Sequence, residues 1–394
     1  MNRTTSRGRR VSSADIARIF LGWGAFGALQ LAGTHLEPTL PAATLAATLG
    51  MIVGVIIICA FGVVTQAEAL ARRLGDPYGS LVLTLSIVVI EVILIAAIMF
   101  GTGEHATIGR DSVMAVSMII LNLVIGLSIV LGSRRHRRLV VNRQGTVAYL
   151  SMITVLGFLG FALPRWIGHS GSYTTNQEVP IIVAAVVVYA AFLYRQMGPR
   201  ADDFREPDVR EAGAVPTRHQ RDSSRHEVAT RVLSLPTGQA RPDQRTEVTT
   251  RLVVLVATMI PIVLVSHDMA TLLDDGLARL DAPVALSGVL IAVVVFLPEG
   301  LTSVRAALGG EMQRVSNLCH GALVSTLALT IPAVLGIGMV TGETVVLAES
   351  PINLALLAVT TVLSWVTFTA RRLTAGHGAA HLVLFVAYGV TMFA

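Results

Sequence analysis

The chain has 394 residues, of which 53% are hydrophobic and 14% are charged, whereas about 25% of the residues of an average soluble domain are charged. Its mean hydropathy is +0.68. This composition excludes an ordinary soluble enzyme and predicts an all-α protein that crosses a membrane several times. Cys59 and Cys319 both lie in apolar segments, which indicates packing residues and not a disulfide framework.

Eleven apolar segments follow one another along the chain, each about as long as a membrane-spanning helix. They cover residues 16–32, 45–64, 78–100, 112–131, 147–163, 179–194, 252–269, 283–303, 314–340, 352–369 and 379–394. All 30 basic residues are arginines, and with a cytoplasmic N-terminus all except Arg110, Arg165 and Arg279 lie on the cytoplasmic side. Because cytoplasmic loops carry the excess of positive charge, we predict this orientation, with the C-terminus outside, in a bacterial-type inner membrane.

A polar, Pro- and Arg-rich stretch separates the spans into a group of six and a group of five. Residues 198–250 lack an apolar period, which predicts a mostly disordered cytoplasmic linker. We expect its arginines to contact anionic lipid and not nucleic acid. The predicted organisation is a tail and extra helix over 1–40, a five-helix repeat over 41–197, the linker, and a second five-helix repeat over 251–394.

The two predicted repeats share a polar pattern. An Asn-Leu-x-x-Gly sequence begins at Asn122 and again at Asn317, and in each half the preceding span carries a lone glutamate, Glu91 or Glu299. Repeats with an odd number of spans must lie in the membrane with opposite orientations. Such inverted repeats place a binding site at their interface near the middle of the membrane.

Both glutamates are expected deep in the membrane. Glu91 lies 13 residues beyond Tyr78 and Glu299 lies 13 beyond Leu286, which is about 20 Å along a helix. A carboxylate there costs at least ~2.5 kcal/mol and marks an ion or proton path; the alternative for either one alone is a protonated carboxyl that packs helices. Two carboxylates with other oxygen ligands suit Ca²⁺ or Na⁺. The same carboxylates can bind protons instead, and competition between cation and proton for one site is the basis of an antiporter.

Further polar side chains are predicted to support this site. Asn122 and Asn317 would complete the coordination, and Pro298 and Gly300 would break the helix around Glu299 and free backbone carbonyls. His320 would relay protons or pack between helices. The supporting set is Ser325, Thr302, Ser303 and His320, with His267 as a further residue that could carry protons at the outer side.

Several longer motifs resemble the ChaA-type calcium/proton antiporters of the Ca²⁺:cation antiporter superfamily. They are Gly75-Asp-Pro-Tyr-Gly79, Pro298-Glu-Gly-Leu-Thr-Ser303, Gln313-Arg-Val-Ser-Asn317 and Ser325-Thr-Leu-Ala-Leu-Thr-Ile-Pro332. The resemblance implies eleven spans, two inverted repeats, and exchange of cytoplasmic Ca²⁺, or in some members Na⁺ or K⁺, for external H⁺. It places the paired acids of the family on Glu91 and Glu299 and its repeat asparagines on Asn122 and Asn317. The long linker and His267-Asp268, where a basic pair is expected, depart from the family pattern.

Two other functions are compatible with buried glutamates in a membrane protein. A passive cation channel would use Glu91 and Glu299 as a charged constriction. A membrane-embedded metal-dependent enzyme would need a paired nucleophile and base or a histidine-rich metal site, and the polar residues within the predicted spans show neither arrangement. It contains no P-loop, dinucleotide fingerprint or HExxH motif. We therefore predict a transporter that needs no cofactor and whose partners are inorganic cations, protons and the lipid bilayer.

Overall fold

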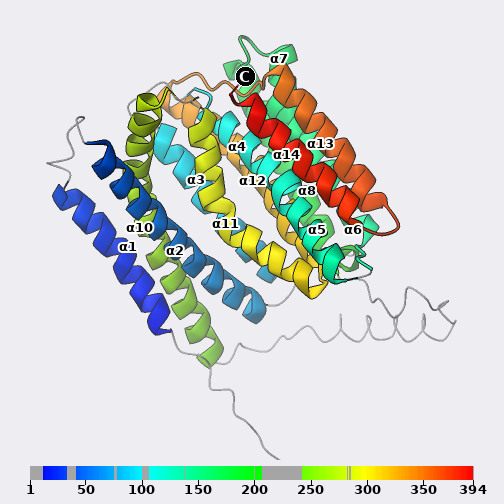
Figure 1. Cartoon of the computed structure of the whole chain (residues 1–394), viewed down its shortest axis with the longest axis horizontal. Helices are drawn as coiled ribbons and strands as arrows, with labels where there is room; N and C mark the ends of the chain where they lie inside the picture. The colour runs from blue at the N-terminus through cyan, green and yellow to red at the C-terminus, as the bar shows by residue number, and fades with distance from the viewer. Residues whose placement is uncertain are drawn as a thin grey trace, which may run out of the picture.

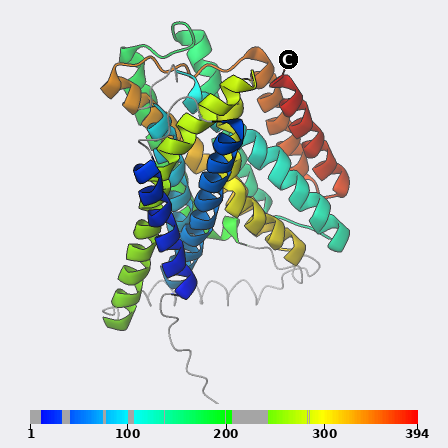
Figure 2. The same ribbon diagram turned by 60° about the vertical axis from the view of Figure 1, so that its left-hand side comes forward.

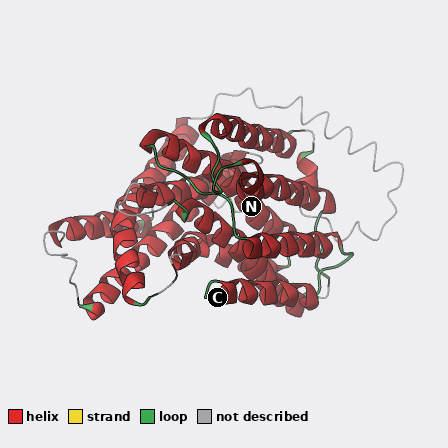
Figure 3. Ribbon diagram, turned by 90° about the horizontal axis from the view of Figure 1, so that it is seen from above, coloured by secondary structure: helices red, strands yellow, loops and turns green. Residues whose placement is uncertain are grey.

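The computed structural model describes residues 12–32, 41–74, 78–99, 106–136, 138–198, 200–205, 242–281, 283 and 285–393. This part of the chain is a bundle of helices, as Figures 1 and 3 show, and its β-structure is limited to isolated bridges such as Ser172 with Val346. The prediction of an all-helical protein is confirmed for the described residues.

The first half of the bundle contains two helical runs that include a π-helical turn. One is α4 (Ile108–Met118), η1 (Ile119–Val124) and α5 (Ile125–Arg135). The other is α6 (Arg143–Gly157), η2 (Phe158–Ala162) and α7 (Leu163–Ile167). The remaining helices of this half are α1 (Ser13–Ala32), α2 (Ala42–Leu74), α3 (Tyr78–Met99) and α8 (Thr175–Met197).

The second half begins inside the stretch that we predicted as a linker. Its helices are α10 (Pro242–Arg279), α11 (Ala285–Gly309), α12 (Met312–Thr341), α13 (Pro351–Thr369) and α14 (Ala375–Thr391). Residues 242–250 are therefore helical, with Pro242 at the first position, where a proline costs no hydrogen bond. Glu247 and Arg251 form an ion pair of 3.1 Å one turn apart. Within 200–205 a short 3₁₀ turn, η3 (Ala201–Phe204), precedes residues 206–241, which lie outside the described residues.

The helices differ in how much of their apolar surface is buried. In the described chain seven are long and apolar enough to cross a membrane, or eight if α11, which is bent, is taken as one span; α14 is apolar but shorter. The run of α4, η1 and α5 buries 83% of its most apolar window, and α12 buries 61%, against 22% for α8 and α13. The first two lie in the interior, and α8 and α13 present apolar side chains that suit lipid.

Three helices lie together along one side of the bundle. Figures 1 and 2 show α1, α2 and α10 together on one side and α13 and α14 on the other, with α3, α11 and α12 between them. The contact of α14 with α5 depends on two glycines, because a Cβ atom at Gly378 would lie 2.7 Å from the carbonyl oxygen of Gly126. Small residues allow helix backbones to approach closely inside a membrane.

The two ends of the bundle carry different connections. At the end uppermost in Figure 1, here the upper end, α7 and residues 168–174 meet the segment 342–350. At the opposite, lower end, Leu139 after α5 pairs with Leu373 between α13 and α14. Arginines gather at the lower end, where α5 finishes with Arg134 and Arg135 and α13 is followed by two more.

Candidate cation and proton site

Glu91 is buried between α3 and α12. The residue is only 3% exposed. Its Oε2 atom accepts a hydrogen bond of 2.6 Å from Oγ1 of Thr326 on α12. The Oε1 atom is buried and has no hydrogen-bond partner among the described residues. One oxygen of this carboxyl group is thus held in place and the other is unused.

Glu299 has the same character on α11. It is 3% exposed, and its Oε2 atom is buried without a hydrogen-bond partner in the described part of the chain. The helix bends by 55° between Leu286–Val294 and Phe296–Gly309, because Pro298 has no N–H to bond the carbonyl one turn earlier. The predicted local break is therefore present as a sharp bend one turn before Glu299, and the residues around Glu299 themselves are helical.

The two glutamates share one electrostatic environment. Glu299 interacts electrostatically with both Glu91 and Glu68, and Glu68 lies on α2, outside the set that we predicted from the sequence. These side chains belong to α2, α3 and α11, which contact one another, and α12 contacts both α3 and α11. Carboxyl groups from the first and second halves therefore influence one another electrostatically.

Thr326 is the site residue that the sequence analysis missed. It lies 14 residues after Met312, as Glu299 lies 14 after Ala285, so both are about 20 Å into their helices. The predicted residue, Ser325, is rotated away by one position: its Oγ atom is 2.9 Å from the hydroxyl of Tyr189 and donates to a backbone carbonyl. The Ser-Thr dipeptide was a signal for a hydroxyl ligand but did not show which of its two residues faces Glu91.

The hydroxyl groups that follow Glu299 have partners of their own. Thr302 donates to the carbonyl oxygen of Pro298 at 2.9 Å, and Ser303 accepts a hydrogen bond of 3.4 Å from the thiol of Cys319 on α12. The first bond stabilises the turn that contains Glu299, and the second fastens α11 to α12.

Asn122 contacts neither glutamate in the described structure. It is fully buried in η1, where its Nδ2 atom donates to Thr360 at 2.9 Å and its Oδ1 atom is 3.2 Å from Nδ1 of His381. A π-helical turn often marks a functional position, and here it directs the amide toward α13 and α14. Asn122 joins these two helices to the interior of the bundle.

Asn317 occupies a different depth from Asn122. It lies only five residues after the start of α12, half-buried, and its amide donates to the carbonyl oxygen of Phe204 at 2.7 Å and accepts from Gln313 at 2.9 Å. Asn122 follows Glu91 by 31 residues, whereas Asn317 follows Glu299 by 18. The structure therefore brings together the two glutamates and leaves the two asparagines in separate clusters.

His320 lies in a third buried cluster. It is fully buried, and its Nδ1 atom is 2.9 Å from the hydroxyl of Ser316. Its ring packs edge-on against that of Phe368, with 4.7 Å between the ring centroids. Its Nε2 atom has no hydrogen-bond partner within the described residues. For His267, only the backbone in α10 belongs to the described structure.

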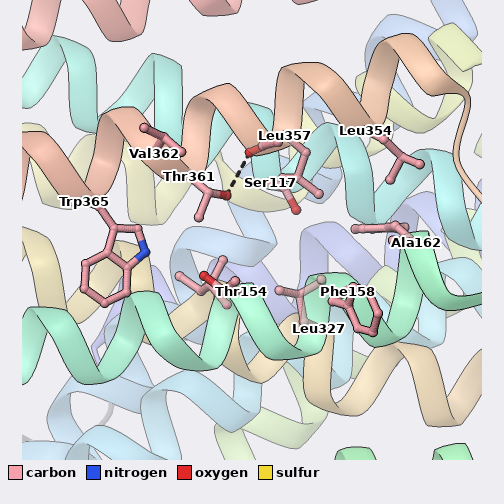
Figure 4. Close-up of a pocket in the computed structure, with 14 residues that line it drawn as sticks. Ser117, Thr154, Phe158, Ala162, Leu327, Leu354, Leu357, Thr361, Val362 and Trp365 are labelled. Atoms are coloured by element: carbon pink, nitrogen blue, oxygen red, sulfur yellow. Dashed lines mark hydrogen bonds between the residues drawn. The ribbon is translucent and has the colours of Figure 1, made fainter.

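A cavity of about 340 Å³ lies between α6, η2 and α13, and neither glutamate lines it (Figure 4). Its walls are apolar, and the hydroxyls of Ser117, Thr154 and Thr361 bond carbonyls of their own helices at 2.7–2.8 Å. Figure 4 shows the bond of Thr361 to Leu357 and Trp365 at one end of the cavity. Because no charged group lines it, this cavity is unsuited to a cation.

The chain and its fold are similar to those of known proteins. The chain matches the sodium/calcium exchanger protein family over residues 44–198 and 250–394. It is 32% identical to the sodium-potassium/proton antiporter ChaA of Escherichia coli over 340 residues, which cover 86% of this chain and 87% of that protein. The fold is similar to that of YfkE, with a TM-score of 0.67, 14% identity and coverage of 96% and 99% of the two chains. It is also similar to the H⁺/Ca²⁺ exchanger CAX, with a TM-score of 0.66, 12% identity and coverage of 96% and 89%.

A helical membrane bundle with buried carboxyl groups is typical of ion transporters. More specifically, the chain belongs to the sodium/calcium exchanger family and, within it, to the ChaA-type cation antiporters. The resemblance that the sequence motifs indicated is confirmed.

Proposed function

We propose that this protein is a secondary active antiporter that exports Ca²⁺, or Na⁺ or K⁺, from the cytoplasm in exchange for H⁺. The observation that carries the proposal is a pair of buried oxygen atoms, Oε1 of Glu91 and Oε2 of Glu299, that lack hydrogen-bond partners among the described residues. A buried carboxylate without a partner is costly, so each group needs either a cation or a proton. One site that alternates between the two ligands gives exchange.

The chemistry of the site supports this competition. Two carboxylates are neutralised by one divalent cation or by two protons, so cation binding displaces protons and the reverse. The Thr326 hydroxyl retains lone pairs for a cation while it donates to Glu91. Oxygen ligands of this kind suit Ca²⁺ and Na⁺. We assign Asn122 and Asn317 positioning roles, because their amides fasten neighbouring elements.

The proposal includes the topology. It has eleven spans, which include two inverted five-helix repeats over 41–197 and 251–394. In this topology the lower end of the bundle and the N-terminus lie in the cytoplasm, and the upper end lies outside. The arginines at the lower end support this orientation, and the two stretches that match the family flank the same division. Relative movement of the helix groups around the glutamates would expose the site to each side in turn.

The test is transport by the purified protein in liposomes that contain a pH-sensitive dye. Ca²⁺, Na⁺, K⁺ and Mg²⁺ are added separately to vesicles with an imposed pH gradient. We expect Ca²⁺ and at least one monovalent cation to dissipate the gradient with saturating kinetics. Cation uptake without proton movement would contradict antiport and indicate a passive channel.

A further inference from the structure

Glu349 is a further buried carboxyl group, and it lies outside the spanning helices, in the segment 342–350 at the upper end. The Glu349 side chain is 1% exposed. Its Oε2 atom accepts hydrogen bonds from the backbone N–H of Ser350 at 3.0 Å and from Nδ2 of Asn353 at 2.9 Å. Its Oε1 atom is buried without a hydrogen-bond partner in the described chain, and Nε of Arg110 lies 3.8 Å away.

Arg110 is shared between two carboxylates. It pairs with Asp111 at 2.8 Å and also donates to the carbonyl oxygen of Ala348 at 2.9 Å. Tyr388 on α14 interacts electrostatically with both Glu349 and Asp111. The titratable and charged groups that face Glu349 are thus Arg110 and Asp111 of α4 and Tyr388 of α14. When both carboxylates are ionised, the cluster has one negative charge in excess, which burial makes costly.

The segment that carries Glu349 ties the two halves together. Val346 N donates to the carbonyl oxygen of Ala106 at 2.9 Å, and Ala348 N donates to that of Gly171 at 2.9 Å. The backbone N–H of Glu349 itself donates to the carbonyl oxygen of Phe161 at 3.1 Å. A change in charge at Glu349 therefore acts where α4 and η2 of the first half meet the connection between α12 and α13.

We infer that Glu349 is a further proton-binding residue, besides Glu91 and Glu299, and that its protonation weakens the hold of Arg110 on the segment 342–350. The proton supplies the missing positive charge, so the attraction between Glu349 and Arg110 ends and Arg110 keeps Asp111 as its partner. The role of this proton in transport rests on the proposed function. External H⁺ enters from the upper end, and its binding to Glu349 would loosen the contact between Arg110 and the segment 342–350 at that end.

The environment favours the proton at Glu349. Burial raises the pKa of this carboxyl group, opposed by the hydrogen bond from Asn353 and by Arg110, and Asp111 raises it further. Glu349 therefore keeps its proton at pH values at which an exposed glutamate has lost it. The stability that this proton provides is complete below the ordinary pKa of a glutamate and is lost as the pH rises through the raised value.

An infrared pH titration of the purified full-length protein in lipid nanodiscs tests proton binding without transport. The protonated carboxyl band of the wild type should lose one component in Glu349→Gln and none in Glu343→Gln, the matched control on the exposed start of the same segment. If Glu349→Gln does not fold, Asn353→Ala serves instead: it removes a donor to the ionised group, so the midpoint of that component should move to higher pH. A titration unchanged by Glu349→Gln or Asn353→Ala would overturn the inference.

The role in transport is tested in liposomes by varying only the pH on the side of the upper end. The wild type and Glu343→Gln should gain more activity as this pH falls than the larger proton gradient alone provides. Glu349→Gln, which resembles the protonated form, should keep only the part that is due to the gradient. A dependence as steep in Glu349→Gln as in the wild type would contradict the loosening of the segment. If the wild type transports nothing, the proposed function fails while the infrared titration still decides proton binding.

Discussion

Thr326 on α12 donates a hydrogen bond of 2.6 Å to Oε2 of Glu91 on α3. The bond joins a helix of the second half to a helix of the first, about midway along both. It also fixes which carboxyl oxygen is engaged, and so leaves Oε1 as the buried atom without a partner.

Replacing Thr326 by valine should weaken cation binding without unfolding the protein, because valine keeps the shape and removes the donor. A hydrogen bond to a charged group contributes about 1.5 kcal/mol, which corresponds to roughly a tenfold rise in the KM for the cation. Thr326→Ser should restore most of the affinity. Ser325→Ala is the control, since that hydroxyl faces Tyr189; an equal effect of both losses on KM would refute the special role of Thr326.

Pro298→Ala should reduce the transport rate on the order of tenfold, because a displacement of a binding group by about an ångström lowers the rate strongly. Alanine restores the missing backbone bond, straightens α11 and moves Glu299 relative to Glu91. The matched control is Pro332→Ala in α12, a helix interior proline with no comparable bend described. Transport rates and circular dichroism of the two variants decide; wild-type rates in Pro298→Ala would show that the bend is dispensable.

Asn122→Ala should affect stability more than cation affinity. The substitution leaves Thr360 and His381 without their amide partner, at a cost of about 2 kcal/mol. Thermal unfolding in detergent should therefore begin at a lower temperature while the KM of the folded fraction stays near the wild-type value. A large rise in KM with unchanged stability would instead show that Asn122 coordinates the cation.

Single cysteines test the proposed orientation. Cys59 and Cys319 are both buried, so background labelling should be low. A membrane-impermeant maleimide should label Glu343→Cys in intact cells and Arg371→Cys only in inverted vesicles, because they lie at the upper and lower ends. The reversed pattern would invert the topology, and labelling of both from one side would refute the predicted number of spans.

The positions of the helices and of the two glutamates were predictable because both depend on local sequence. A long apolar segment must form a helix in lipid, and a lone acid within it stands out against its neighbours. The partners of these acids depend on helix rotation and depth instead. The sequence therefore indicated Ser325. The next residue, Thr326, lies about 100° further around the helix, and its hydroxyl is the one that bonds Glu91.

The asparagines show how a short repeat can mislead. Asn122 and Asn317 share a pattern with a glycine four residues later, but their distances from the preceding glutamates differ by more than three helical turns. Their amides satisfy other polar groups, on His381 and on the backbone of Phe204. Glu349 was not singled out, because it lies in a connection, and only the fold places it beside Arg110.

We propose that one pair of carboxyl groups binds cation and proton in turn. This is tested by cation-driven proton flux in inverted membrane vesicles for wild type, Glu91→Gln, Glu299→Gln and the exposed control Glu343→Gln. We expect the flux to be lost in both buried variants, with the proteins still inserted and folded, and to be unchanged in the control. Full cation-dependent proton flux in Glu91→Gln and Glu299→Gln would contradict it.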